Sequence, residues 1–347
     1  MLPRRRGTRS IPARGLRQSP TQAYRVMNVR RIMKLRQPGG FAGLATVIAT
    51  TALALVASTM PAQASTLPMQ GEAQAFFNST LIWNYTAAPL GANRPCTPSA
   101  AHPYPVILTE GTFASMYNSF GAISPDLVNN GYCVYAFNYG QTIPLSGFYA
   151  MGSIASSAAK LSTEVNSVLS ETSAGKVDIV GWSQGGMMPR YYINDLGGAA
   201  KVNMLVGLAP SNYGTNLNGF VNLVSDFGAL GVTTTLLSVT CKACAEQFQG
   251  SSFLSGLNQT PTVAAVKYVV IETADDDVVT PYTNAFLPTA GNVQDITLQT
   301  QCSRDASDHI SIPYDSNALQ DMINVLGPDS PGFQPSCAAV GPIIGNV

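Results

Sequence analysis

The stretch that decides the fold is KVDIVGWSQGGMMPRYY, residues 176–192. It starts with a β-branched run that predicts a strand over residues 177–182, and a mixed polar and apolar pattern then predicts a helix that begins at Gln184. Between them Ser183 has a glycine two positions before it and another two positions after it. In this Gly-x-Ser-x-Gly pattern the glycines leave room for a sharp strand-to-helix turn that exposes the serine at the sheet edge. We therefore predict that Ser183 is a nucleophile, with a plain glycine-rich turn as the alternative.

Strands and helices are predicted to alternate on both sides of this turn. Apolar or β-branched runs predict strands over residues 106–109, 133–139, 177–182, 202–208, 267–272 and 293–300. Helical patterns occur over residues 126–130, 153–171 and 316–326, besides the helix that follows Ser183. Such alternation predicts an α/β fold with a mostly parallel sheet and helices on both faces.

One segment, residues 211–260, is longer than an ordinary connection between two strands. Its apolar residues have the spacing of one helix face: Phe220, Leu223, Val224, Phe227 and Leu230. The segment is either a core helix or a cap or lid whose apolar face touches an apolar substrate. A loop over residues 141–151 offers further apolar side chains for an acyl groove, or for ordinary packing: Leu145, Phe148 and Tyr149.

A serine hydroxyl becomes a good nucleophile only when a base accepts its proton. The chain contains two histidines, His102 and His309. The order that accompanies this serine motif is serine, acid, histidine, and only His309 follows Ser183. His102 precedes the first predicted strand of the sheet, where we expect surface packing. We therefore expect His309 to be the base, and a surface histidine in an acidic loop is the alternative.

The acid that orients the histidine should lie between these two residues, at the end of a strand. Asp275, Asp276 and Asp277 directly follow the predicted strand over residues 267–272. Three adjacent aspartates cannot all point at one imidazole ring. A calcium site or a solvated turn is the competing interpretation of the cluster, and the local chemistry does not rank the three residues.

Acyl transfer also needs hydrogen-bond donors for the oxyanion. The backbone N–H of Gln184 opens a helix beside the serine and is one candidate. The second should come from the loop after the first strand, where Gly111 permits close approach and Thr112 offers its N–H and its hydroxyl. Glu110 is an unusual neighbour for an anion, and we expect its side chain to be turned away or hydrogen-bonded.

The N-terminal region has the pattern of an export signal. Residues 1–36 carry eleven basic and no acidic residues, residues 41–58 are apolar and uncharged, and Ala-Gln-Ala follows at 62–64. This pattern predicts a secretory signal peptide over residues 1–64, with a long basic extension, and a membrane anchor is the alternative. The remaining residues, 65–347, form one predicted catalytic domain with eight basic and nineteen acidic residues, a net charge of −11. Such a charge disfavours nucleic acid and anionic lipid as partners.

The chain has six cysteines, an even number that in an exported protein indicates disulfides. Six cysteines allow fifteen pairings, and spacing alone does not choose among them. We favour the pairs Cys96–Cys133, Cys241–Cys244 and Cys302–Cys337. A zinc site is the alternative for Cys241-Lys-Ala-Cys244, although it would need two further ligands.

Together these motifs resemble secreted α/β-hydrolase lipases, with fungal lipase B and actinobacterial triacylglycerol lipases as the most similar groups. The resemblance covers residues 103–337 and rests on four segments: WSQGG at 182–186, DDVVTP at 276–281, LAPSNYGT at 208–215 and CKACAEQFQGSSFLSGLN at 241–258. The second segment selects Asp276 as the acid. The resemblance also supports the Cys241–Cys244 and Cys302–Cys337 disulfides, and it implies an oxyanion hole made by Thr112 and Gln184. Glu110 departs from the pattern, because the actinobacterial relatives commonly have a histidine there.

The resemblance implies an α/β-hydrolase fold and a secreted serine hydrolase of carboxylic esters, most similar to a triacylglycerol lipase. The implied partner is a lipid or another apolar ester at a lipid–water interface, and we expect a monomer with no nucleic acid and no integral membrane partner. The mechanism needs no metal and no organic cofactor. A polyester- or cutin-type esterase, an acyltransferase and a non-enzymatic secreted binding protein are the alternatives.

Overall fold

The computed structural model describes residues 66–80, 84–229, 241–328, 330 and 332–347. These residues belong to one compact unit. The predicted signal peptide and Leu230 lie outside the described residues. Within them, no helix has the length and apolar character needed to cross a bilayer.

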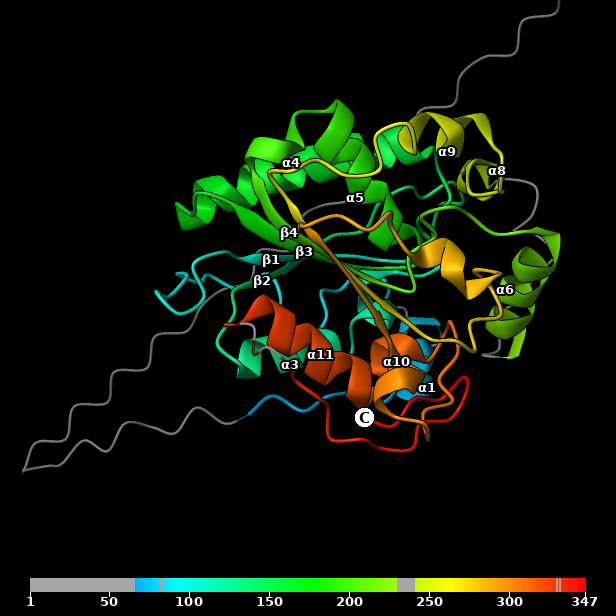
Figure 1. The fold of residues 1–347 in the computed structure, drawn as a ribbon. Coiled ribbons are helices and arrows are strands. Elements are labelled where there is room, and N and C mark those ends of the chain that lie inside the picture. Colours follow the sequence, from blue (N-terminus) through cyan, green and yellow to red (C-terminus); the bar gives the residue numbers. More distant parts are fainter. Residues whose placement is uncertain (1–65, 81–83, 230–240, 329, 331) are drawn as a thin grey trace, which may run out of the picture. The chain divides into compact units, whose positions relative to one another are not determined.

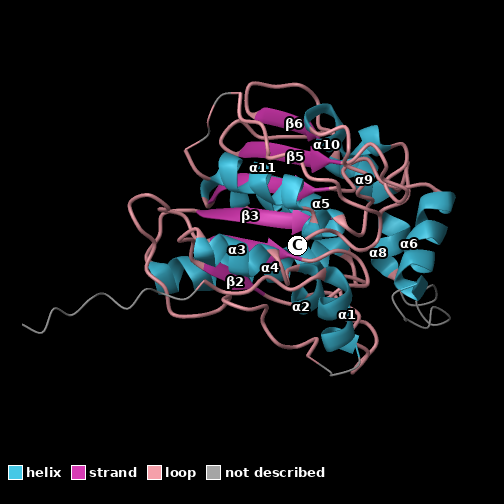
Figure 2. Cartoon of the chain, turned by 90° about the horizontal axis from the view of Figure 1, so that it is seen from below, coloured by secondary structure: helices cyan, strands magenta, loops and turns pink. Residues whose placement is uncertain are grey.

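Six parallel strands form the sheet in the order β2-β1-β3-β4-β5-β6 (Figure 2). Their bounds are β1 Val106–Thr109, β2 Val134–Ala136, β3 Val177–Trp182, β4 Val202–Leu208, β5 Lys267–Glu272 and β6 Val293–Thr297. Every residue of β3 is buried, and only one residue of β4 is partly exposed. Strands buried on both faces are typical of parallel sheets that are covered by helices, which explains their continuous apolar runs.

Helices cover both faces of this sheet, as Figure 1 shows. The helices α4 (Ile154–Thr172) and α5 (Gln184–Asp195) lie on one face, and α3 (Ile123–Asn129) and α11 (Ser316–Leu326) lie on the other. The described residues also form the α-helices α1 Glu72–Thr80, α2 Met116–Ser119, α6 Leu217–Ala229, α8 Lys242–Glu246, α9 Ser252–Leu257 and α10 Leu298–Gln301. The expected α/β architecture is therefore confirmed.

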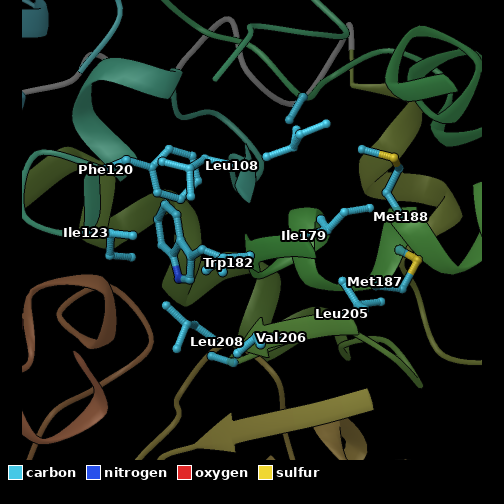
Figure 3. Close-up of a cluster of buried hydrophobic side chains, with 14 of the residues drawn as sticks. Leu108, Phe120, Ile123, Ile179, Trp182, Met187, Met188, Leu205, Val206 and Leu208 are labelled. Atoms are coloured by element: carbon cyan, nitrogen blue, oxygen red, sulfur yellow. The ribbon is translucent and has the colours of Figure 1, made fainter. Parts of the chain in front are cut away.

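The core lies along the central strands. Figure 3 shows apolar side chains from β1, β3, β4 and α5 in one cluster, with Trp182 between Phe120 and Leu208. Ile179, Leu108 and Met187 in the same cluster are completely buried. Burying such a side chain contributes roughly 1.5–3 kcal/mol, so this cluster fixes the position of the turn at the end of β3.

Two predicted strands are shorter in the structure than the sequence suggests. The edge strand β2 covers only Val134–Ala136, and the side-chain amide of Asn93 pairs with its open edge, where it bonds the N–H and the C=O of Ala136 at 2.8 and 2.7 Å. The strand β6 ends at Thr297, where α10 begins. The helix α1 was not predicted, since none of the helical patterns in the sequence covers residues 72–80.

All six cysteines are paired, as Cys96–Cys133, Cys241–Cys244 and Cys302–Cys337. These are the pairs favoured from the sequence. The Cys241–Cys244 bridge leaves no thiolate for the zinc site considered there. Across the described ranges no group of three or more His, Cys, Asp or Glu side chains has the arrangement of a metal site.

Candidate active site

Ser183 occupies the turn between β3 and α5 with φ 55° and ψ −121°, a backbone conformation that non-glycine residues rarely adopt. The glycines on either side make this turn possible. A Cβ on Gly181 would lie 2.0 Å from the carbonyl oxygen of Gly185, and a Cβ on Gly185 would lie 1.9 Å from that of Thr109. No side chain fits at either position, so the two glycines are needed for the sharp turn, as the motif predicts.

His309 lies in the loop between α10 and the short helix Ile312–Tyr314, and its side chain is completely buried. Its Nε2 is 2.9 Å from Ser183 Oγ, and its Nδ1 is 2.8 Å from Asp276 Oδ2. The indole N–H of Trp182 donates to the main-chain oxygen of His309 at 2.9 Å, which fixes the loop against the sheet. The structure thus brings together three side chains that are remote in the sequence.

Asp276 is the aspartate of the cluster whose carboxylate bonds to the ring. Its other oxygen, Oδ1, accepts the backbone N–H groups of Val278 and Val279 at 2.8 and 2.7 Å. These bonds hold the carboxylate in one orientation. The main-chain oxygen of the next residue, Asp277, accepts a bond from the Asn222 side chain of α6. The loop therefore distinguishes between neighbours that the local sequence could not rank.

The electrostatics of the site favour a charged imidazole. Burial lowers the pKa of His309, but the charge of Asp276 and its hydrogen bond outweigh this effect, and the resulting pKa lies above the usual value of 6.5. The charges of Asp277 and Asp308 act in the same direction. The site consequently stabilises the imidazolium that would form when Ser183 loses its proton.

Thr112 and Gln184 lie at the two positions expected for an oxyanion hole. Within the described residues, neither backbone N–H donates to a protein acceptor. Gln184 is the first residue of α5, whose unpaired N–H groups favour a negative charge. The Thr112 hydroxyl oxygen accepts the side-chain amides of Gln184 and Gln247, at 2.8 and 2.9 Å.

Sequence reasoning missed Gln247, although it lies within a segment that carries the family resemblance. Gln247 and Thr112 are 135 positions apart. A glutamine in a polar loop has no local signature, and only the fold reveals this contact.

Glu110, the departure from the family pattern, is completely buried. Its Oε1 accepts the backbone N–H of Tyr139 at 3.0 Å, and its main-chain oxygen accepts the Tyr139 hydroxyl. Burial raises the pKa of Glu110 well above its ordinary value, which favours the uncharged form. The side chain is hydrogen-bonded, as expected, and an uncharged carboxyl does not oppose an oxyanion nearby.

The candidate site is covered in this conformation. Ser183 is 4 % exposed and His309 is 0 % exposed. The helix α6 packs onto the Thr112 loop, because Phe227 meets the Phe113 ring with centroids 5.9 Å apart, and it meets Phe76 of α1 at 5.6 Å. His102 contributes nothing to this arrangement, since its ring packs on Tyr132 with centroids 3.9 Å apart.

A parallel sheet with a serine at a strand-to-helix turn, and with an acid and a histidine on later loops, is the arrangement of an α/β-hydrolase. The structure of lipase B from Aspergillus fumigatus is similar in fold, with a TM-score of 0.53 and 18% identity over 69% of this chain and 57% of that one. Residues 103–312 match the family Lipase (class 2), and the chain belongs to this family. It is accordingly a carboxylic ester hydrolase of the lipase type.

Two bacterial relatives have closer sequences. The triacylglycerol lipases of Pseudarthrobacter phenanthrenivorans and Burkholderia plantarii are each 30% identical to this chain over 238 residues. The alignments cover 66% of this chain, 68% of the first relative and 61% of the second.

Proposed function

We propose that this protein is a secreted serine lipase in which Ser183, His309 and Asp276 form the catalytic triad. The observation that carries the proposal is the chain of contacts from Ser183 Oγ through His309 to Asp276, at 2.9 and 2.8 Å, within a buried site. Triads are recognised by this geometry together with the roles it permits.

In the proposed reaction Ser183 Oγ attacks the ester carbonyl while His309 Nε2 accepts the serine proton. Asp276 holds the imidazole by its Nδ1 and stabilises the cation. His309 then protonates the leaving alcohol, and an acyl-enzyme remains on Ser183. Water cleaves this intermediate with the same base, so the enzyme is regenerated.

The tetrahedral oxyanion would accept hydrogen bonds from the Thr112 and Gln184 N–H groups. The Thr112 hydroxyl is a third donor. Loss of one such donor typically reduces kcat by on the order of 10²- to 10³-fold.

The substrate class follows from what surrounds the serine and from the relatives. Phe113 lies in the loop that carries Thr112, and Phe220 and Phe227 pack near its ring, so the three rings offer apolar contact to an acyl chain. Both bacterial relatives are triacylglycerol lipases. We therefore propose lipid esters, and in particular triacylglycerols, as substrates, with α6 as a lid that moves away at a lipid–water interface.

Secretion is supported by the three disulfides, which persist mainly in oxidising compartments. The N-terminal signal pattern of the sequence supports it as well. We expect the mature enzyme to act as a monomer.

The test is hydrolysis of p-nitrophenyl esters of increasing chain length and of a triacylglycerol emulsion, with the wild-type protein and Ser183→Ala. We expect the variant to lose turnover by about 10⁶-fold, which is the typical effect of removing a triad serine. Undiminished turnover in Ser183→Ala would contradict the proposed mechanism. Turnover that does not change with acyl chain length would indicate an esterase rather than a lipase. Acyl transfer to an added alcohol at a higher rate than hydrolysis would indicate an acyltransferase.

A further inference from the structure

The hydroxyl group of Thr112 has an unusual set of partners. Its oxygen accepts a hydrogen from Gln184 Nε2 at 2.8 Å and another from Gln247 Nε2 at 2.9 Å. A threonine hydroxyl has one donor proton and two acceptor lone pairs. Both lone pairs are therefore occupied by amide donors.

The orientation of each amide is fixed by a second contact. Gln184 Nε2 also donates to the carbonyl oxygen of Ala150 at 2.8 Å, and Gln247 Nε2 also donates to that of Ala243 at 3.2 Å. A carbonyl oxygen can only accept, so rotating either amide by 180° would place two acceptors against each other. Both hydrogens of each amide nitrogen are in use, and neither amide can accept the proton of Thr112.

The proton of Thr112 is consequently left without an acceptor among the described residues. The backbone N–H of the same residue and that of Gln184 also lack one. These three unused donors belong to the two residues of the proposed oxyanion hole. An acceptor that arrives there during acyl transfer would satisfy all of them.

Gln247 is itself held rigidly. It is buried at the end of α8, where its N–H donates to Ala243 O at 3.0 Å and its Oε1 accepts the Ser211 hydroxyl at 2.8 Å. The Cys241–Cys244 disulfide closes the other end of α8. The backbone and the side-chain oxygen of Gln247 are therefore fixed, and its amide nitrogen is held against the Thr112 hydroxyl.

We propose that Gln247 is a positioning residue, which directs the hydroxyl proton of Thr112 into the oxyanion hole by donating to its oxygen. Gln247 does not touch the substrate in this scheme and acts through Thr112. The inference rests on the proposed function and adds a residue that neither the sequence motifs nor the triad identifies.

The test is Gln247→Glu, which has nearly the same shape and keeps an acceptor for Ser211. The introduced carboxylate cannot donate, so the Thr112 proton turns toward it and leaves the oxyanion hole. We expect kcat for a soluble ester to fall on the order of 10²-fold, as for the loss of one oxyanion donor, with little change in KM. The Ki of a trifluoromethyl ketone, which forms a tetrahedral oxyanion on Ser183, should rise in parallel.

Two controls separate positioning from folding. Gln249→Glu makes the same change on an exposed side chain of the same loop, whose amide donates to Thr280 O, and it should leave kcat unchanged. In a Thr112→Val background, Gln247→Glu should cause little further loss of kcat, because the hydroxyl through which it acts is absent.

An unchanged kcat in Gln247→Glu would overturn the inference. A loss that persists undiminished in the Thr112→Val background would overturn it too, since the effect would then not pass through the hydroxyl. Neither result would contradict the proposed triad, which is tested separately by the activity of Ser183→Ala in the otherwise wild-type protein.

Discussion

At the scale of single residues, the conformation of Ser183 depends on the glycines beside it. Ser183 sits at positive φ, where an ordinary residue is strained by roughly 1–3 kcal/mol. The surrounding structure holds this conformation because the backbones of Gly181, Gly185 and Thr109 approach closely without side chains between them. Removing that space should disturb both stability and activity.

Gly185→Ala tests this dependence. The new methyl group would lie 1.9 Å from Thr109 O, so the backbone must shift. We expect the free energy of unfolding to fall by about 3 kcal/mol or more and the ester turnover to be lost, as in severe overpacking. Urea unfolding and a p-nitrophenyl ester assay measure the two effects. Gly256→Ala, in α9 with open space around its Cα, is the matched control and should preserve both.

The aspartate cluster gives a second prediction at this scale. His309 must be neutral to accept a proton, and its raised pKa means that kcat/KM falls as the pH drops through a value above 6.5. Asp277 contributes to the raised pKa without touching the ring, so Asp277→Asn should move this acidic limb to lower pH and keep most of the activity. Asp276→Asn should instead reduce kcat by about 10⁴-fold. Equal losses in both variants would contradict the assignment of Asp276.

At the scale of elements, the packing of α6 bears on the choice between core helix and lid that the sequence left open. Its inner face is core, since Phe227 is completely buried between Phe76 and Phe113. Its outer face carries Leu217 and Val221, which are 66 % and 56 % exposed. Exposed Asn218 and Ser225 share this face, so two apolar side chains stand among polar ones on a helix that packs against the Thr112 loop.

Phe227→Ala tests whether α6 acts as a lid. The change removes the contacts to Phe76 and Phe113, which should destabilise the closed arrangement and expose Ser183 more often. We expect faster labelling of Ser183 by a soluble phosphonate in the absence of lipid. Val221→Ala, on the outer face, should label at the wild-type rate. A lower melting temperature with no faster labelling would show that α6 is a core helix only.

The sequence was most informative where burial and local pattern agree. The strands β3, β4 and β5 have the predicted bounds, because strands covered on both faces are continuous apolar runs. It failed where a distant side chain decides the structure. Asn93 pairs with the open edge of β2 from 43 positions away, and α1 gains its apolar environment from Phe227, 151 positions beyond Phe76.

The same distinction holds within the site. The motif and the chain order were enough to select Ser183 and His309, and the resemblance selected Asp276 from its neighbours. Gln247 could not be found, because its contact with Thr112 exists only after two loops are brought together by the fold.

At the scale of the whole molecule, the fold encloses several carboxyl groups that do not belong to the proposed triad. Asp178 lies near the amino end of β3, at the other end of the strand from Ser183, and Asn203 donates to it at 2.8 Å. Burial raises its pKa to about 7, and burial likewise raises the pKa of Asp315 to about 7 and that of Asp321 to about 6. These groups couple the stability of the enzyme to pH.

The sign of this coupling can be predicted. A carboxyl whose folded pKa is raised binds its proton more tightly in the folded state, so its contribution to stability is full at low pH and is lost as the pH rises toward 7. We expect the melting temperature to be higher at pH 5 than at pH 8. Asp178→Asn keeps the acceptor for Asn203 and should reduce this difference. A variant with the wild-type dependence on pH would show that Asp178 does not take part.

The central claim concerns one atom, the hydroxyl oxygen of Ser183. Its most direct test is to treat the active protein with a p-nitrophenyl alkylphosphonate until turnover stops and to map the adduct by mass spectrometry of peptides. The account predicts one phosphonate per chain, on the peptide that contains Ser183, with loss of activity in proportion to labelling. Complete inactivation with Ser183 unmodified and the adduct on another residue would contradict it.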